Sequence, residues 1–292
     1  MPARRRVLAI AGLGVLVVAA ALMLLSPRHR EFYFGTARRA STPVKQVATD
    51  VASGVASGVR IAMTGPPAGI KPVAISTRGR TLAMDPDGRL RVPITTETPL
   101  PRLPADGVPK GWELREFTGR ADVQMIRAPQ GLAVLLKADR TSFALYRDVI
   151  VDLDVLPRLS WTWRVTKLPL RGDVRQKASD DQAAQVYVIF PRWPSPRATS
   201  DVIGYVWDST APVGTTIVSP HASNVRVVVV ESGPGQLNSW QRRERDVAAD
   251  FAGLFGRRPS RVGGVAVMID ANDTASTAEA AIGHLTFSRP PT

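Results

Sequence analysis

Cysteine is absent from this 292-residue chain, and histidine occurs only three times. Without cysteine the chain cannot form a disulfide framework, a zinc ribbon, a thiol nucleophile or a cysteine-ligated iron–sulfur cluster. Three histidines leave little for a histidine-rich metal site. The patterns G-x-S-x-G and H-E-x-x-H and a phosphate-binding glycine loop are also missing. The sequence therefore contains no catalytic motif, and it indicates architecture and location more clearly than activity.

Positive charge is concentrated at the N-terminal end rather than spread over the chain. The formal net charge is +13, but residues 1–100 hold 14 Lys and Arg against 5 Asp and Glu, whereas residues 101–292 hold 24 against 20. The C-terminal part is thus close to balanced, and we expect no specific recognition of nucleic acid. A hydrophobic fraction of 44% with 22% charged residues is enough for a folded core.

A long hydrophobic run occurs once, from residue 7 to residue 25, directly after three arginines. Its 19 uncharged residues would form a helix about 28 Å long, close to the roughly 30 Å hydrocarbon core of a bilayer. The residues before Pro27 show no small-residue cleavage pattern. We therefore predict an uncleaved single-pass membrane anchor, with the rest of the chain exported. Release after cleavage of a signal peptide is the alternative.

Residues 31–107 are predicted to form a basic spacer that is rich in proline and glycine. Nine prolines interrupt this stretch and oppose both helices and strand ladders. The tetrapeptide Val-Ala-Ser-Gly occurs twice in succession over residues 51–58. It indicates a low-complexity linker or an apolar stripe for a partner. The Pro-Asp-Gly turn at residues 86–88 favours a small hairpin.

From residue 108 to residue 288 the pattern is that of a β-rich domain. In the stretch 159–165, apolar Leu and Trp alternate with Ser, Thr and Arg, which is the period of a strand covered on one side. Similar short runs predict strands over 112–117, 132–137, 143–148, 159–165, 185–190, 203–207, 225–232, 262–270 and 282–287. So many strands with one helix favour an all-β, antiparallel β-sandwich of the jelly-roll type.

One short helix is predicted over residues 247–255. Asp246 is suited to cap its start, and Gly256 followed by Pro259 is suited to end it. Just before it, residues 239–246 alternate Trp, Arg, Glu and Asp against Gln and Arg, so both faces are polar. This segment is predicted to be an edge strand or part of a solvated site.

Seven short motifs occur between residues 159 and 274: LSWTWRV at 159–165, KASDD at 177–181, VYVIF at 186–190, YVW at 205–207, VVESG at 229–233, ERDV at 244–247 and DANDT at 270–274. Together they resemble the bacterial domain-of-unknown-function family 3047. The resemblance covers residues 110–288 and implies an exported β-sandwich with a galactose-binding-like or carbohydrate-binding-module-like outline and no established activity. With the predicted anchor, it implies a protein of the bacterial inner membrane whose C-terminal domain lies in the periplasm.

Asp270, Asn272 and Asp273 are the candidate metal ligands. They place three oxygen-bearing side chains at a predicted strand end, and Ca²⁺ requires six to eight oxygen ligands. The competing interpretation is an ordinary turn in which these side chains bind nearby backbone. The segment lacks the spacing and the terminal Glu of an EF-hand. Calcium is therefore the one cofactor that the sequence suggests.

Two further groups of residues are candidate ligand contacts. Arg164 and the adjacent carboxylates Asp180 and Asp181 are suited to form a bidentate ion pair that holds either a loop or a ligand. Aromatic rings are suited to stack on sugars, and we expect this role for Tyr205, Trp207 and Trp240. Trp207 and Trp240 are predicted to be exposed, whereas Trp161 and Trp163 share an apolar stripe and are predicted to pack in the core.

The preferred functional hypothesis is that the sandwich binds a glycan or another cell-envelope component, with Glu244 beside Trp240 as a further contact. A second hypothesis is a carbohydrate-active hydrolase in which Asp181 acts with Glu231, Glu244 or Asp246 as acid and base, because such enzymes need two facing carboxyls. A third is a structural interaction module of an envelope assembly. The spacing of the chain's carboxylates in sequence does not distinguish these alternatives.

Overall fold

The computed structural model describes residues 75–77, 80–82, 84–95, 108–192, 200–259 and 261–291. The chain divides into two compact units, Met1–Gly65 and Pro66–Thr292, and every described residue belongs to the second. The predicted anchor at residues 7–25 and most of the predicted spacer lie outside the described residues. None of the helices that are described combines the length and the apolar character needed to cross a membrane.

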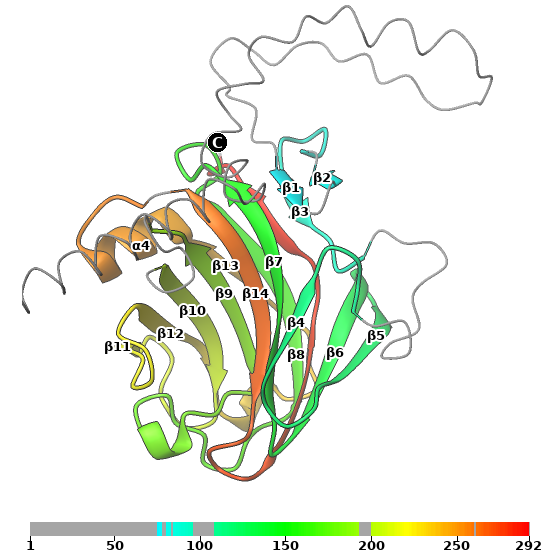
Figure 1. Ribbon diagram of the computed structural model, residues 1–292, viewed down its shortest axis with the longest axis vertical. Coiled ribbons are helices and arrows are strands. Elements are labelled where there is room, and N and C mark those ends of the chain that lie inside the picture. Colours follow the sequence, from blue (N-terminus) through cyan, green and yellow to red (C-terminus); the bar gives the residue numbers. More distant parts are fainter. Residues whose placement is uncertain are drawn as a thin grey trace, which may run out of the picture. The chain divides into compact units, whose positions relative to one another are not determined.

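Most of the described chain forms two sheets, and Figure 1 shows their long strands. The first sheet has seven strands. In spatial order they are β11 (Thr216–Val218), β12 (Val225–Ser232), β10 (Asp201–Asp208), β9 (Ala184–Phe190), β14 (Val262–Asp270), β7 (Ser142–Val151) and β4 (Glu113–Thr118). Its neighbours are antiparallel except for β10 and β12, which run parallel. The prediction of purely antiparallel sheets is wrong for that pair.

The second sheet contains the predicted tryptophan-rich strand, β8. Its path is β3 (Leu90–Val92), β16 (Leu285–Ser288), β8 (Arg158–Lys167), β15 (Thr277–Ile282), β6 (Gly131–Asp139) and β5 (Asp122–Ala128), while β13 (Gln241–Asp246) pairs with β8 off this path. The segment 282–287, predicted as one strand, is divided between β15 and β16. A separate two-stranded sheet joins β1 (Ile75–Thr77) and β2 (Arg80–Leu82), and short 3-10 turns occur as η3 (Lys177–Ser179) and η4 (Pro234–Gln236).

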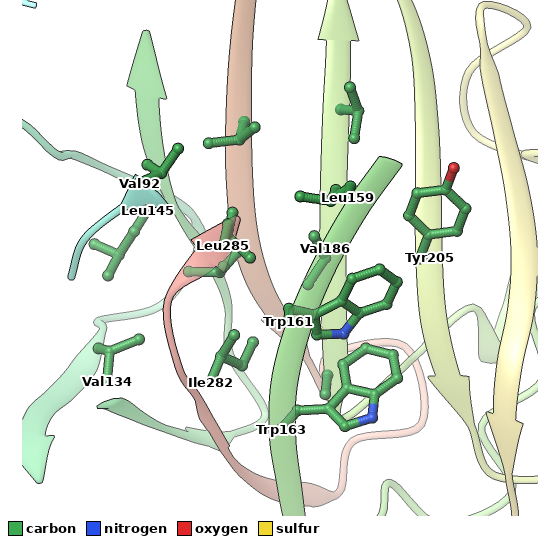
Figure 2. Close-up of a cluster of buried hydrophobic side chains, with 14 of the residues drawn as sticks. Val92, Val134, Leu145, Leu159, Trp161, Trp163, Val186, Tyr205, Ile282 and Leu285 are labelled. Atoms are coloured by element: carbon green, nitrogen blue, oxygen red, sulfur yellow. The ribbon is translucent and has the colours of Figure 1, made fainter. Parts of the chain in front are cut away.

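Alternation along β8 determines which side chains enter the core. Leu159, Trp161, Trp163 and Val165 are buried, whereas the residues between them are partly exposed. Figure 2 shows Trp161 and Trp163 on the same side of β8, with Tyr205 of β10 beside Trp161. The Trp161 and Tyr205 rings stack at 5.4 Å. The predicted β-sandwich is confirmed as a mostly antiparallel, mostly β domain with a single α-helix among the residues described.

The sandwich also takes a strand from the segment predicted as spacer. β3 pairs with β16, and Leu90, Val92 and Ile94 are at most 1% exposed. The indole nitrogen of Trp112 and the Arg147 guanidinium both donate to the carbonyl of Pro93. The predicted domain start at residue 108 is therefore too late, because prolines at residues 86 and 93 flank a short strand without interrupting it.

The predicted helix is present as α4 (Val247–Phe255), at one end of the sandwich strands in Figure 1. The Asp246 carboxylate accepts a hydrogen bond from the Ala249 amide, and Gly256 ends the helix with a left-handed φ of 66°. Phe251 is buried and packs on Phe190 of β9, with ring centroids 4.4 Å apart. The cap and the apolar face confirm the boundaries expected from sequence.

Candidate functional site

The polar side of the β8–β13 pair carries three of the side chains that the sequence suggested as ligand contacts: Arg164, Trp240 and Glu244. In the register of this pair Arg242 lies opposite Thr162, and Glu244 lies opposite Ser160. Opposite residues of antiparallel strands share a face, and the alternate residues of β8 point into the core. We define the β8–β13 face as the outward side chains of these strands and of the residue preceding β13: Arg158, Ser160, Thr162, Arg164, Trp240, Arg242 and Glu244.

Arg164 and Trp240 form the distinctive pair on this face. The Arg164 guanidinium carbon lies 5.3 Å from the centroid of the Trp240 ring, a cation–π distance. Both side chains are partly exposed. The Nε atom of Arg164 is buried and has no hydrogen-bond partner within the described residues, and no ion pair of Arg164 occurs among them. The pair thus combines an accessible aromatic ring with an unused donor.

The remaining charged side chains of the face are already engaged with one another. Arg158 donates to one Glu244 carboxylate oxygen at 2.7 Å, and Arg242 lies 3.7 Å from the other. The Gln130 amide donates to the Thr162 hydroxyl at 3.0 Å. A Cβ atom at Gly283 would lie only 2.5 Å from that hydroxyl, so glycine is needed for this close approach of β15 and β8. The face is therefore preorganised and rich in hydrogen-bonding groups.

Tyr205 and Trp207, two of the predicted ligand contacts, lie in the core instead. Both are 0% exposed. The Trp207 indole nitrogen donates to the Gly233 carbonyl, and its ring lies 6.0 Å from that of Trp163. The predicted exposure of Trp207 is wrong because Ile203, Tyr205 and Trp207 form the inward row of β10. The spacing of these three residues, two apart along the strand, could have indicated that they share one buried face.

Asp180 and Asp181 lie at the loop before β9 and do not meet Arg164. Asp181 is fully buried, and its carboxylate accepts hydrogen bonds from the Asp273 and Thr274 amides and from the Thr274 hydroxyl. The predicted ion pair with Arg164 is therefore wrong for this residue. Burial raises the pKa of the Asp180 carboxyl to about 6, although the imidazole of His221 lies 3.7 Å away.

The bonds from Asp181 bring the motifs at 177–181 and 270–274 together, which sequence reasoning missed. Burial, with the Asp181 carboxylate as the next cause, raises the pKa of Asp270 to about 8. The side-chain amide of Asn272 donates to one oxygen of the Asp273 carboxylate, and the other oxygen lies 3.4 Å from the His221 imidazole. Across the described ranges, no set of three or more His, Cys, Asp and Glu side chains is arranged to hold a metal ion. Calcium binding by Asp270, Asn272 and Asp273 stays a prediction.

The inward side chains of β13 form a set of ion pairs that the sequence did not reveal. Arg243 pairs with Glu231 of β12. The Nε and Nη2 atoms of Arg245 donate to the two oxygens of Asp250 on α4, at 2.9 and 2.5 Å. The Tyr205 hydroxyl donates to the same carboxylate at 2.8 Å. These charges neutralise one another at the edge of the core, which explains why an edge strand carries arginine on both faces.

The four carboxylates considered for a hydrolase have separate partners. Asp181 binds the 273–274 turn, Glu231 pairs with Arg243, Glu244 pairs with Arg158, and Asp246 caps α4. None of these contacts makes an acid–base pair of two carboxyls. The carboxyls whose pKa values burial raises, at residues 180, 208 and 270, are not among the four carboxylates of that hypothesis.

A family model described as "Protein of unknown function (DUF3047)" matches residues 110–286. No curated protein matches the chain. The solved structures that are similar to this chain include the following three. One is the glycoside hydrolase domain of Endo-D from Streptococcus pneumoniae R6, with 13% identity and a TM-score of 0.32 over 62% of this chain and 22% of that chain. Another is the xyloglucanase domain of NopAA from Sinorhizobium fredii, with 12% identity and a TM-score of 0.33 over 59% of this chain and 91% of that chain. The third belongs to the carbohydrate-binding modules of the β-sandwich superfamily, with 16% identity and a TM-score of 0.31 over 61% of this chain and 57% of that chain.

This chain thus spans about a fifth of the length of the Endo-D domain. With TM-scores of 0.31 to 0.33 and identities of 12% to 16%, these structures lead to no conclusion about the ligand or the activity of this chain.

Proposed function

Because this chain belongs to DUF3047, a family of proteins of unknown function, we propose its role from the geometry of its domain. The sandwich, a jelly roll of galactose-binding-like outline, binds a glycan or another component of the bacterial cell envelope through the β8–β13 face. The observation that supports this most directly is the partly exposed ring of Trp240, set among hydrogen-bonding side chains on the outside of a sheet.

The chemistry of this face suits a saccharide. The flat side of an indole contacts the CH groups of a sugar ring, while nearby polar groups bind its hydroxyls. Ser160, Thr162 and Arg164 provide such groups, and they are partly exposed. Because these side chains project from paired strands, the face is held rigidly and loses little conformational entropy on binding. A partly exposed tryptophan on a polar face is therefore better explained by ligand binding than by a role in core packing.

Replacing Trp240 tests this proposal. We expect Trp240→Ala to abolish retention of the full-length chain on the polysaccharide or envelope fraction that retains the parent, because the stacking surface is lost. Base–aromatic stacking on proteins offers a scale of about 1–3 kcal/mol for such a surface, equal to roughly a 5- to 150-fold loss of affinity. Affinity electrophoresis in gels containing the polysaccharide measures this change.

Phe117→Ala is the matched control for this test, because Phe117 is an aromatic residue exposed on β4 of the other sheet. Its retention should equal that of the parent. Both variants should keep the parental melting temperature, which shows that the fold is intact. Unchanged retention of the Trp240→Ala variant contradicts the proposal.

We also propose that residues 7–25 anchor the chain in the inner membrane and that its C-terminal domain lies in the periplasm. The uncharged 19-residue run behind three arginines supports this placement. Protease added to spheroplasts should digest the domain, and a cytosolic marker protein should survive the same treatment. Complete protection of the domain contradicts an outside location.

A further inference from the structure

We infer that the β8–β13 face recognises an acidic glycan, one whose sugar units carry carboxylates, and that Arg164 binds the carboxylate while Trp240 contacts the sugar ring. This inference rests on the proposed function and specifies the ligand of the same face. It comes from the state of each charge on the face, because only some of these charges are neutralised.

The carboxylate of the face and the two carboxylates nearest to it along these strands already have partners. Glu244 is paired with Arg158 and lies near Arg242. Asp246, the next outward residue of β13, accepts the hydrogen bond that caps α4, where the helix dipole favours a negative charge. Farther along, the Thr166 hydroxyl of β8 donates to Glu279 of the neighbouring strand β15, which also lies 3.6 Å from Lys137. These three acidic groups therefore have partners other than Arg164.

Arg164 is the cation of this face that lacks an acidic partner among the described residues. Its Nε atom is buried without a hydrogen-bond acceptor there, but its two Nη atoms are not among the buried side-chain atoms that lack a partner, so a ligand would meet the guanidinium through these two nitrogens. A guanidinium binds a carboxylate best through two parallel hydrogen bonds. The same domain contains a bidentate pair between Arg245 and Asp250, which there uses Nε and Nη2.

Trp240 places the sugar and orients the guanidinium. The 5.3 Å contact with its ring holds Arg164 over the indole, so the side chain is ordered before a ligand arrives. The Trp240 indole and the Arg164 guanidinium are adjacent. In a uronic acid the sugar ring and its carboxylate are adjacent in the same way. A neutral glycan would offer Arg164 only uncharged hydroxyl oxygens, without the negative charge and the paired oxygens of a carboxylate. An acidic sugar uses both side chains, which is why we favour it.

The test compares two polymers with the same backbone and different charge, polygalacturonic acid and its methyl ester. Binding to the full-length chain, kept in a zwitterionic detergent that contains no sugar, is measured by calorimetry at fixed salt. We expect the acid to bind at least about tenfold more tightly than the ester. Arg164→Gln should remove at least tenfold of the affinity for the acid and leave binding of the ester unchanged.

Two further variants make the result specific. Arg164→Lys keeps the charge but not the paired donors, and it should recover only part of the lost affinity. Arg115→Gln is the control, because Arg115 also lies over an aromatic ring, at 4.5 Å from Tyr146, but on β4 of the other sheet. It should bind both polymers as the parent does. Thermal melts of each variant verify folding.

Each remaining outcome decides between the two proposals. Equal affinity for acid and ester overturns the acidic-ligand inference and leaves the proposed glycan function in place. Equal losses in the Arg164→Gln and Arg115→Gln variants overturn the assignment to Arg164, because they indicate a diffuse response to charge. Failure to bind either polymer overturns the inference, and failure to bind any member of a neutral and acidic glycan array overturns the proposed function as well.

Discussion

At the scale of single residues, the partners of a carboxylate determine what its burial does. Asp181 is fully buried, but three hydrogen-bond donors of the 273–274 turn surround it. Asp270 accepts a long bond of 3.4 Å from the backbone amide of Asn272, interacts with the Ser142 side chain and lies beside the Asp181 carboxylate. Desolvation and the neighbouring charge therefore favour the protonated form of Asp270.

The first prediction follows from the pKa of Asp270, which is raised in the fold to about 8 from an ordinary value of 3.8. A raised carboxyl pKa means that the folded state binds more protons than the unfolded state between these two values. Its contribution to stability is complete below about pH 4 and is lost as the pH rises through 8. Asp270→Asn should remove this loss, because its amide stays neutral and is able to donate to Asp181.

Melting temperatures of the parent and the variant between pH 5 and pH 9 measure this effect. At pH 9 the variant should be more stable by on the order of 1 kcal/mol, or about 2–4 °C for a domain of this size. Asp139→Asn is the control, because Asp139 is mostly exposed and pairs only with the adjacent Arg140. A melting curve for Asp270→Asn with the same pH dependence as the parent contradicts the prediction.

Sequence reasoning predicted Arg164, Trp240 and Glu244 as ligand contacts, and the structure places all three on one face. It failed for Tyr205 and Trp207, which are buried. The difference is physical. Polar residues alternate around Arg164 and Glu244, so their outward direction is visible in the local pattern. A tryptophan in an apolar strand lies inside or outside according to which sheet covers it.

At the scale of elements, β13 and α4 follow each other directly in the chain and form one linked unit at the edge of the sandwich. β13 pairs with β8 only, as the polar pattern of an edge strand predicts. Its inward arginines are neutralised by Glu231 and by Asp250 on α4. The bidentate pair from Arg245 to Asp250 fastens the helix to the strand that precedes it.

The second prediction concerns the cap that joins these two elements. Asp246→Ala removes the acceptor of the Ala249 amide and should lower the free energy of unfolding by about 1 kcal/mol. Asp246→Asn should cost only a few tenths of that amount, since asparagine caps helices about as well as aspartate. Chemical denaturation of both variants measures the difference. Equal losses from the alanine and asparagine variants would show that charge, and not capping, dominates.

The parallel pairing of β10 with β12 belongs to this scale too. Both strands were predicted, within a few residues of their observed ends. Their relative direction was not, because β11 lies between them in sequence and pairs with β12 as an antiparallel neighbour. The hydrophobic pattern of a strand is the same in either direction. The connection that decides the direction is irregular and leaves no periodic signal.

At the scale of the whole described domain, β3 closes part of the second sheet with a strand from far upstream. Leu90, Val92 and Ile94 are all buried, and Pro93 accepts hydrogen bonds from Trp112 and Arg147. A core built from residues distant in sequence is stable only when all of its parts are present. The upstream segment is therefore part of the domain, although the family match begins at residue 110.

The third prediction is that removing this segment destabilises the domain. Burial of one such aliphatic side chain stabilises by about 1.5–3 kcal/mol, so a chain that starts at residue 108 should lose roughly 5 kcal/mol relative to one that starts at residue 66. For a domain of this size that equals a fall of about 10–20 °C in melting temperature. Circular dichroism measures both melts. Identical melting temperatures would contradict a role for β3 in the core.

The sequence by itself determined the local features of this protein: strands with one apolar face, a capped helix, a polar edge strand and a family resemblance. All of these depend on contacts between residues close in the chain or on the period of the backbone. Tertiary structure alone decided that β3 joins the sandwich, that Trp207 is covered and that the 177–181 and 270–274 motifs meet. It also decided that Arg164 lies over Trp240 and has no acidic partner in the part of the chain that the structure describes. Alternation shows that one face of a strand is covered, but the covering element is selected by the free energy of the whole packed domain.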